Sequence, residues 1–221
     1  MNINKNIENS IFTVSLDPVV FTIHENKLMM LLVNQEFDNV KKWMIPGGLF
    51  KQDDLTLENG LMRILETKTG CKANYFEQLF SRTGHDTRSP TVSISYMALI
   101  NHTDALKENA KWFSIEQVNK LELNFDHKEI FKMAISRLTS KVNYSTLPMY
   151  LLDNKFTLPD LQKVYEVILD TKLDKSSFRK RIMSSNVLVD TQESQHNGSC
   201  RPSVLYSLKN EEVYNFQNNI K

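Results

Sequence analysis

The sequence has few of the features that mark secreted, membrane-spanning or zinc-binding proteins. Its two cysteines, Cys71 and Cys200, lie far apart and are expected to be free thiols in a reducing cytosol. No apolar run approaches the ~20 residues that cross a bilayer, and the polar segment 1–10 has no signal-peptide core. The five histidines show no ligand spacing. We therefore expect a cytoplasmic protein with no membrane association, no metal site and no cofactor.

The chain also has no excess of positive or negative residues: its net charge is only +1 over 221 residues. This balance favours no particular class of partner, and the length allows one large or two small domains. The local distribution is more informative. Residues 172–181 contain five basic residues and one acidic residue. Such a run is often only a solvated face, so it gains meaning from its structural context.

The segment 43–70 combines a Pro-Gly-Gly turn with a predicted helix. Thr56 is a suitable N-cap and Gly70 a suitable C-terminal stop. The apolar residues between them recur at helical spacing: Leu57, Leu61, Ile64 and Leu65. An ordinary amphipathic helix would account for this spacing alone. The preceding residues Pro46-Gly47-Gly48 favour a more specific motif.

This segment resembles the Nudix box, whose pattern is G-x5-E-x7-R-E-U-x-E-E-x-G-U, where U is a bulky aliphatic residue. The positions that match the frame of the pattern are Gly48, Arg63, Leu65 and Gly70. The positions that carry the family's clustered glutamates are occupied by Ile64, Thr67 and Lys68. The chain therefore has the scaffold of a hydrolase motif without its acidic residues.

The loss of the acids has a direct chemical consequence. Residues 64, 67 and 68 share one helix face, where three carboxylates would hold divalent cations through oxygen ligands. Lys68 instead places a positive charge on that face. We expect a domain that binds a ligand without hydrolysing it. The alternative is a Mg²⁺-dependent hydrolase of ADP-ribose or a related nucleotide sugar, with a metal site built from Asp53, Asp54, Glu58 and Glu66.

The first part of the chain mixes strands and helices in an order that suits an α/β sandwich. Residues 19–23 and 28–33 predict a hairpin, and further strands are expected at 92–99 and 111–113. Residues 81–90 are polar and predict a surface loop. Asp126 and Glu129 predict a capping box at the start of a helix. The apolar stripe of that helix is expected to comprise Ile130, Met133, Ala134 and Leu138.

A change of pattern at residues 140–148 predicts a junction between a Nudix-like domain, 1–145, and a second domain, 146–221. Thr157 and Asp160 predict a capped start for one helix, and Asp174 predicts the cap of another. Two alternating strands follow, separated by a polar turn. Two helices followed by a two-stranded ribbon are typical of a winged helix-turn-helix domain.

The second helix of this pair has the composition of a DNA-reading helix. Phe178 and Ile182 fall on one side at 100° per residue, and Lys180 falls opposite. Basic side chains neutralise phosphates or donate to guanine, and serines bond to phosphates or base edges. Arg201 follows the turn of the wing. The candidate DNA-binding residues are Lys175, Ser176, Ser177, Arg179, Lys180, Arg181 and Arg201.

Taken together, the two parts resemble the Nudix-related transcriptional regulators, from the Trp43–Gly70 segment to Gly198-Ser199-Cys200-Arg201-Pro202. The resemblance implies a homodimeric repressor or activator that binds double-stranded operator DNA and senses ADP-ribose or a sugar metabolite. The residues available to an anionic effector are Lys51, Arg63, Lys68, Arg82 and Arg88. Besides the regulator and the hydrolase, a third possibility is a protein-interaction module, whose winged helix contacts protein instead of DNA.

Overall fold

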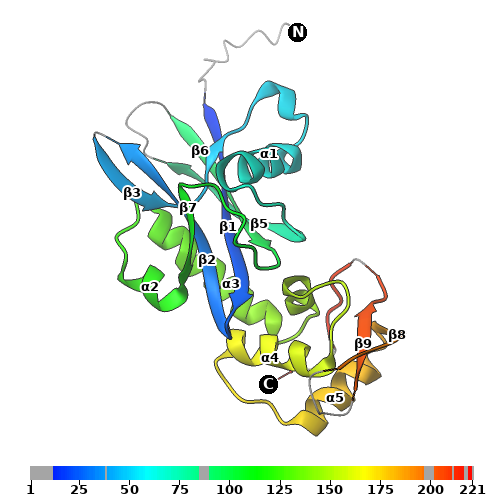
Figure 1. Cartoon of the computed structure of the whole chain (residues 1–221). Helices are drawn as coiled ribbons and strands as arrows, with labels where there is room; N and C mark the ends of the chain where they lie inside the picture. The colour runs from blue at the N-terminus through cyan, green and yellow to red at the C-terminus, as the bar shows by residue number, and fades with distance from the viewer. Residues whose placement is uncertain are drawn as a thin grey trace, which may run out of the picture.

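The first part of the chain folds as a mixed β-sheet between helices, and a small helical domain with a β-ribbon follows it (Figure 1). The computed structural model describes residues 12–37, 39–84, 90–196, 202–210, 212–216 and 219–220. The strands of the first part are β1 (Thr13–His24), β2 (Lys27–Phe37), β3 (Val40–Met44), β4 (Gly48–Leu49), β5 (Tyr75–Gly84), β6 (Thr91–Leu99) and β7 (Ala110–Ser114). Its helices are η1 (Gln52–Asp54), α1 (Leu57–Thr69), α2 (Ile115–Lys120) and α3 (His127–Val142).

The sheet has the strand order β3-β2-β1-β6-β5, with β4 paired to β1 and β7 paired to β2. Only β1 and β6 run parallel, and every other described pair is antiparallel. The expected hairpin is confirmed: Glu25 and Asn26 form a two-residue turn, each with a positive φ. Such a turn matches the twist of the two strands that it joins. The expected strands at 92–99 and 111–113 are also present.

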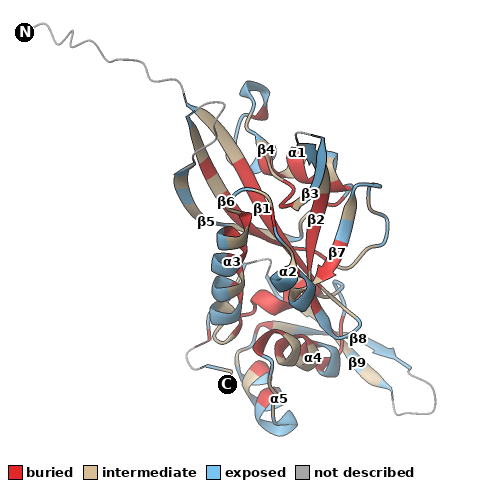
Figure 2. Cartoon of the chain, turned by 90° about the vertical axis from the view of Figure 1, so that its left-hand side faces the viewer, coloured by how far each residue is buried: buried red, intermediate tan, exposed pale blue. Residues whose placement is uncertain are grey.

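The two faces of the sheet carry different helices because side chains alternate along each strand. On β1, Leu16 packs with Leu61 and Ile64 of α1. Val19 and Phe21 instead belong to the large core cluster formed with α3. The result is the α/β/α sandwich expected from the sequence. Figure 2 shows the buried residues concentrated along β1, β2 and the inner sides of the helices.

Three local expectations are wrong. Residues 81–84 continue strand β5, because the antiparallel ladder with β6 extends to Gly84, which pairs with Thr91. The rest of that expected loop, 85–89, lies outside the described residues. Asp126 precedes α3 but makes no side-chain cap, since its carboxylate pairs with Arg82. Met133 is 49% exposed, and the stripe of α3 is completed by Phe131 and Val142 instead.

The second part forms the expected winged helix. Its elements are η2 (Leu147–Leu151), α4 (Leu158–Leu169), α5 (Lys175–Ser184), β8 (Leu188–Gln195) and β9 (Ser203–Leu208). Thr157 and Asp160 form a capping box at α4, and the Asp174 side chain accepts from the Ser177 N–H at the start of α5. These caps satisfy backbone donors that have no partner within the helix.

The two parts share one continuous core. The largest hydrophobic cluster includes Phe21 of β1, Leu138 of α3 and Tyr165 of α4. Tyr165 is fully buried and donates its hydroxyl to the carbonyl of Ser145 at 2.6 Å. Helix α3 reaches Val142, inside the segment expected to be the junction. The winged helix is therefore packed directly against the end of α3.

Candidate effector cleft and nucleic-acid interface

The loop before α1 is held in place by an ion pair. Arg63 donates from Nε to Asp54 Oδ1 at 2.5 Å and from Nη2 to Asp54 Oδ2 at 2.7 Å. The same Nη2 also donates to the carbonyl of Leu49. The hydrogen bonds from Arg63 lower the pKa of Asp54 to about 2. The arginine of the Nudix-like frame thus fixes the loop that follows Gly48, in a bidentate geometry that only arginine provides.

Helix α1 begins and ends as expected. Thr56 accepts from the backbone N–H of Asn59, and Gly70 has a positive φ of 81°. Gly60 meets the loop closely: a Cβ there would lie 2.9 Å from Asp54 Oδ2 and from Leu16. A larger side chain would push α1 away from the sheet. This contact explains a glycine in the first turn of α1, within a helix where glycine is otherwise unfavourable.

The residues at the glutamate positions cannot hold a divalent cation. Ile64 is 2% exposed and points into the core, where a Cβ on Gly48 would lie 3.2 Å from it. Thr67 is exposed, and the Lys68 ammonium donates to the Gln35 amide oxygen at 3.4 Å. A buried aliphatic chain and an ammonium offer no oxygen ligand of the kind that Mg²⁺ requires. The face therefore does not fit the metal that the Nudix frame implies.

The acids considered for an alternative metal site do not gather either. Asp54 is committed to Arg63, and Glu66 forms an exposed pair with Lys72 at 3.5 Å. Asp53 and Glu58 are exposed. Within the part of the chain that the structure describes, no three histidine, cysteine or carboxylate side chains are grouped to hold a metal ion.

A polar cluster lies on the face of the sheet that carries α3, opposite to α1 and near the start of α3. Asp17 of β1 is buried and accepts from Ser93 Oγ at 2.5 Å and from Ser15 Oγ at 3.2 Å. Burial raises the pKa of Asp17 above its ordinary value, against the effect of these hydrogen bonds. The backbone of Gly47 passes directly over the carboxylate, because a Cβ there would collide with Asp17 Oδ1. Ser95 Oγ is buried beside this cluster without a hydrogen-bond partner among the described residues.

Arg82 brings a positive charge to the same face. It forms ion pairs with Asp126 and, at 3.4 Å, with Glu129 at the start of α3. His127 follows, and its Nδ1 accepts from the backbone N–H of Ile45 at 3.0 Å. Burial and the Arg82 charge lower the pKa of His127 to about 4, so the imidazole is neutral near pH 7. The exposed ring of Phe125 lies 5.6 Å from this imidazole.

The predicted effector-binding cations therefore fall into two groups. Lys51, Arg63 and Lys68 lie at α1 and its preceding loop. Arg82 lies opposite Ser93 on the face that carries α3, so the sheet separates it from α1. Arg88 lies outside the described residues. The structure does not bring these residues together in one cluster.

Sequence reasoning missed Asp17, Ser93 and His127 as candidate site residues. Two signals were available for the first two. Asp17 interrupts an apolar run that includes Leu16 and Val19, and Ser93 and Ser95 occupy one face of a strand. Polar side chains on a face that becomes apolar farther along a strand indicate the end of the core. His127 carried no comparable signal, because its burial depends on the distant backbone of Ile45.

Helix α5 presents a basic outer face. Phe178 is 4% exposed and packs edge-to-face on Tyr165 at 5.3 Å, and Ile182 is fully buried. The candidate DNA-binding residues that are exposed on this helix are Lys175, Ser176, Ser177, Arg179 and Lys180. Figure 2 shows α5 at the end of the molecule, exposed along its outer side. The helix is thus free to enter a groove of duplex DNA.

The two remaining candidates differ from these five residues. Arg181 is only partly exposed and lines a groove with Tyr214 and Phe216, near the end of the chain. Arg201 lies outside the described residues. The C-terminal residues that reach this groove were also missed by sequence reasoning, because a short polar segment without periodicity gives no sign of where it packs.

Comparison with known proteins identifies both parts of the chain. The NUDIX domain family matches residues 16–134, and the NrtR DNA-binding winged helix domain matches residues 148–208. A curated relative from Acinetobacter baylyi, the "ADPR responsive transcriptional repressor NtrR", is 34% identical over 203 residues, which cover 87% of this chain and 80% of the relative.

Solved structures agree with these matches. Shewanella oneidensis NrtR in complex with a 27mer DNA superposes with a TM-score of 0.83 at 33% identity, over 94% of this chain and 99% of that chain. The NUDIX domain of the same protein with ADP ribose has a TM-score of 0.54 at 28% identity, over 61% of this chain and 94% of that chain. Since the relatives are matched over most of their length and in both parts, the chain belongs to the family of Nudix-related transcriptional regulators of the NrtR type.

Proposed function

We propose that the protein is a transcriptional repressor whose Nudix-like domain, 1–145, senses ADP-ribose and whose winged helix, 146–221, binds operator DNA. One observation carries the proposal: a Nudix-like frame with Ile64 buried at a glutamate position is joined to a helix with exposed basic residues. A relative that responds to ADP-ribose supports the choice of effector. Because such a repressor acts on operator DNA, we propose a cytoplasmic location. Within the described residues, no helix is long and apolar enough to span a membrane.

The chemistry of the effector suits the polar cluster near the start of α3. The Arg82 guanidinium can pair with a diphosphate in exchange for Asp126, and the exposed ring of Phe125 can stack on adenine. The Asp17 carboxylate is suited to ribose hydroxyls. Lys51 and Lys68 lie across the sheet, at the loop before α1 and on α1 itself, so they are outside this cluster.

The domain acts as a sensor without hydrolysis in this proposal. The support is the loss of oxygen ligands at residues 64, 67 and 68, since a metal clamp supplies the charge stabilisation and activated water for such cleavage. We expect turnover of ADP-ribose with Mg²⁺ or Mn²⁺ far below the ordinary range of ~1 per second. Turnover within that range would favour the hydrolase alternative.

The test of the proposal measures duplex binding by fluorescence anisotropy with and without ADP-ribose. Selection from random DNA supplies the operator. We expect ADP-ribose to change the operator affinity by ~1–3 kcal/mol, and the operator to change ADP-ribose affinity equally. Arg82→Ala abolishes this response and leaves DNA binding intact. Arg137→Ala is the matched control, because Arg137 also lies on the α3 side but pairs only loosely, at 3.7 Å, with Glu77.

The operator is expected to be a two-fold site bound by a homodimer. One winged helix reads only a few base pairs, so two copies place their helices about one helical turn, or a multiple of it, apart. Sedimentation of the protein with and without the operator measures this stoichiometry. If neither ADP-ribose, NAD nor a panel of sugar phosphates alters thermal stability or DNA binding, the sensor role is excluded. If Lys180→Ala and Arg179→Ala both bind the operator with wild-type affinity, α5 does not face DNA. The protein-interaction alternative then replaces the proposed DNA-binding role.

A further inference from the structure

The C-terminal segment returns from the wing to the junction between the two parts of the chain. Tyr214 and Thr146 exchange two hydrogen bonds: the Thr146 N–H donates to the Tyr214 carbonyl, and the Tyr214 N–H donates to Thr146 Oγ1, both at 2.9 Å. The Phe216 N–H donates to the Tyr144 carbonyl at 2.6 Å, and Phe216 is buried. We call residues 213–216 the C-terminal strap. These contacts fix its backbone against the end of α3.

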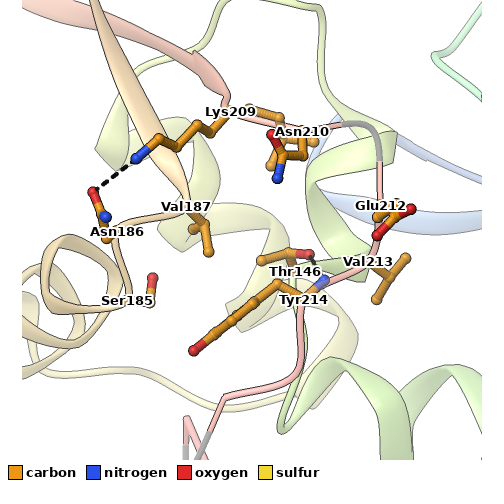
Figure 3. Close-up of a pocket in the computed structure, with 10 residues that line it drawn as sticks. Thr146, Ser185, Asn186, Val187, Lys209, Asn210, Glu212, Val213 and Tyr214 are labelled. Carbon is orange, nitrogen blue, oxygen red and sulfur yellow. Dashed lines mark hydrogen bonds between the residues drawn. The ribbon is translucent and has the colours of Figure 1, made fainter.

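The strap forms a groove with the recognition helix. Its volume is about 450 Å³, and α5 contributes Ser177, Lys180, Arg181 and Ser184 while the strap contributes Tyr214 and Phe216. Figure 3 shows a neighbouring pocket, which Tyr214 and Ser185 line together with Thr146 and Lys209. The described lining of the groove itself carries two cations and several hydroxyls but no carboxylate. This set of groups favours an anion.

Arg181 gives the groove an unmet hydrogen-bonding requirement. The residue is only partly exposed, and its Nη1 is buried without a hydrogen-bond partner among the described residues. A guanidinium nitrogen taken out of water without an acceptor is costly. An oxyanion in the groove would supply that acceptor, whereas the nearest strap side chains are aromatic.

The position of the groove on α5 identifies the source of the anion. At 100° per residue, Ser177, Arg181 and Ser184 lie along one edge of the helix, between the buried side at Phe178 and the outer side at Lys180. A helix seated in the major groove has phosphate backbones along its edges. Lys180 belongs to both the outer face and the groove, so the two surfaces are continuous.

We propose that this groove seats a phosphodiester of the DNA backbone, which makes the C-terminal strap part of the DNA-binding surface. The Tyr214 hydroxyl donates to a phosphate oxygen, and Arg181 and Lys180 neutralise the charge. The proposal rests on the proposed DNA-binding function. It also gives Arg181 a different geometry from that of the outward-facing cations of α5.

The test uses the full chain and a random-sequence duplex over a series of salt concentrations, because phosphate contacts do not depend on base sequence. Arg181→Ala is expected to flatten the slope of log affinity against log salt by about 0.9, the change for one phosphate contact. Tyr214→Phe keeps the ring and removes only the hydroxyl. We expect it to weaken binding about tenfold without changing the slope, since no charge is lost.

Two substitutions that each introduce one negative charge guard against misfolding as an explanation. Ser184→Asp places a carboxylate in the groove at an exposed position, and Ser136→Asp makes the same change at an exposed position on α3. We expect the first to weaken duplex binding at least tenfold, and the second to bind like wild type.

The outcomes separate this proposal from the proposed function. DNA binding through α5 would be excluded if the wild-type protein did not bind the duplex. It would also be excluded if Lys175→Ala and Lys180→Ala bound the duplex with wild-type affinity. If Lys175→Ala weakens binding while Tyr214→Phe, Ser184→Asp and Arg181→Ala keep wild-type affinity and slope, the groove does not hold a phosphate. A lower melting temperature for Arg181→Ala with an unchanged slope would assign that residue a packing role and overturn the proposal.

Discussion

Arg63 and Arg82 of the Nudix-like part differ from the lysines of the recognition helix in what neutralises them. Arg63 is held by Asp54, and Arg82 is held by Asp126 and Glu129. On α5, Lys175 and Lys180 form no ion pair within the part of the chain that the structure describes. A paired cation shapes its surroundings or exchanges one partner for another, whereas an exposed free cation is available to a polyanion.

This difference predicts two kinds of behaviour. Substitution of a paired cation changes folding or ligand response, because its partner is left without compensation. Substitution of a free cation changes DNA affinity and its dependence on salt, because counterions are released when phosphates are neutralised.

The largest expected effect is on folding of the winged helix. Phe178→Ala removes a ring that is 4% exposed and packed on Tyr165, so we expect the free energy of unfolding to fall by ~3–5 kcal/mol. Met183→Ala is the matched control on the same helix, since Met183 is 45% exposed. Denaturant unfolding followed by circular dichroism measures both. A loss below ~1 kcal/mol for Phe178→Ala would mean that α5 does not depend on its apolar face.

The next effect is on pH dependence in the Nudix-like part. The pKa of His127 is lowered from 6.5 to about 4 by burial and by the Arg82 charge. The unfolded state therefore binds more protons between these values, and stability is lost as the pH falls from about 6.5 to 4. The shift corresponds to at most ~3 kcal/mol. His127→Asn keeps an acceptor for the Ile45 N–H without titrating, so its stability should vary less over this range.

Urea unfolding of wild type and His127→Asn at several pH values measures the difference. Asp54 does not contribute in this window, because its pKa is lowered to about 2 and its stabilisation is lost only below pH 4. Identical pH profiles for the two proteins would show that His127 titrates normally.

Sequence reasoning succeeded where the signal is local. The caps at Thr56, Thr157 and Asp174, and the glycine stop at Gly70, are properties of a few neighbouring residues, and all four are present. The apolar stripe of α5 was equally local. Both the sandwich and the winged helix could be predicted because these short-range patterns occur in an order that few folds share.

The sites were harder to predict because they depend on long-range contacts. Asp126 fits the pattern of a cap, but its carboxylate is taken by Arg82, 44 positions earlier in the chain. Ile64 fits both the apolar stripe of α1 and the face of the missing acids, and it is its burial against Gly48 that decides between them. The strap is fixed by hydrogen bonds to Thr146 and Tyr144, and no sequence pattern predicts these bonds. In each case a distant partner decides the outcome.

A smaller effect is expected from the outer face of α5. Lys180→Ala removes an exposed side chain opposite the buried Phe178, so the fold should be unchanged. If Lys180 contacts a base, we expect a loss of ~1–3 kcal/mol in operator affinity, concentrated at one operator position. Competition with operators substituted at each position measures this. An equal loss on every sequence would instead place Lys180 on the DNA backbone, which is its role in the proposed phosphate groove.

The smallest effect tests the division between paired and free cations directly. Lys175→Ala and Arg179→Ala each remove one exposed charge, and each should flatten the slope of log affinity against log salt by about 0.9. Arg63→Ala also removes one positive charge, but from a residue held by Asp54 and remote from α5. We expect it to lower the melting temperature while the slope stays at its wild-type value. If Arg63→Ala flattened the slope as much as Lys175→Ala, net charge alone would govern DNA binding. The contrast between the two regions would then reflect their surroundings without any consequence for recognition.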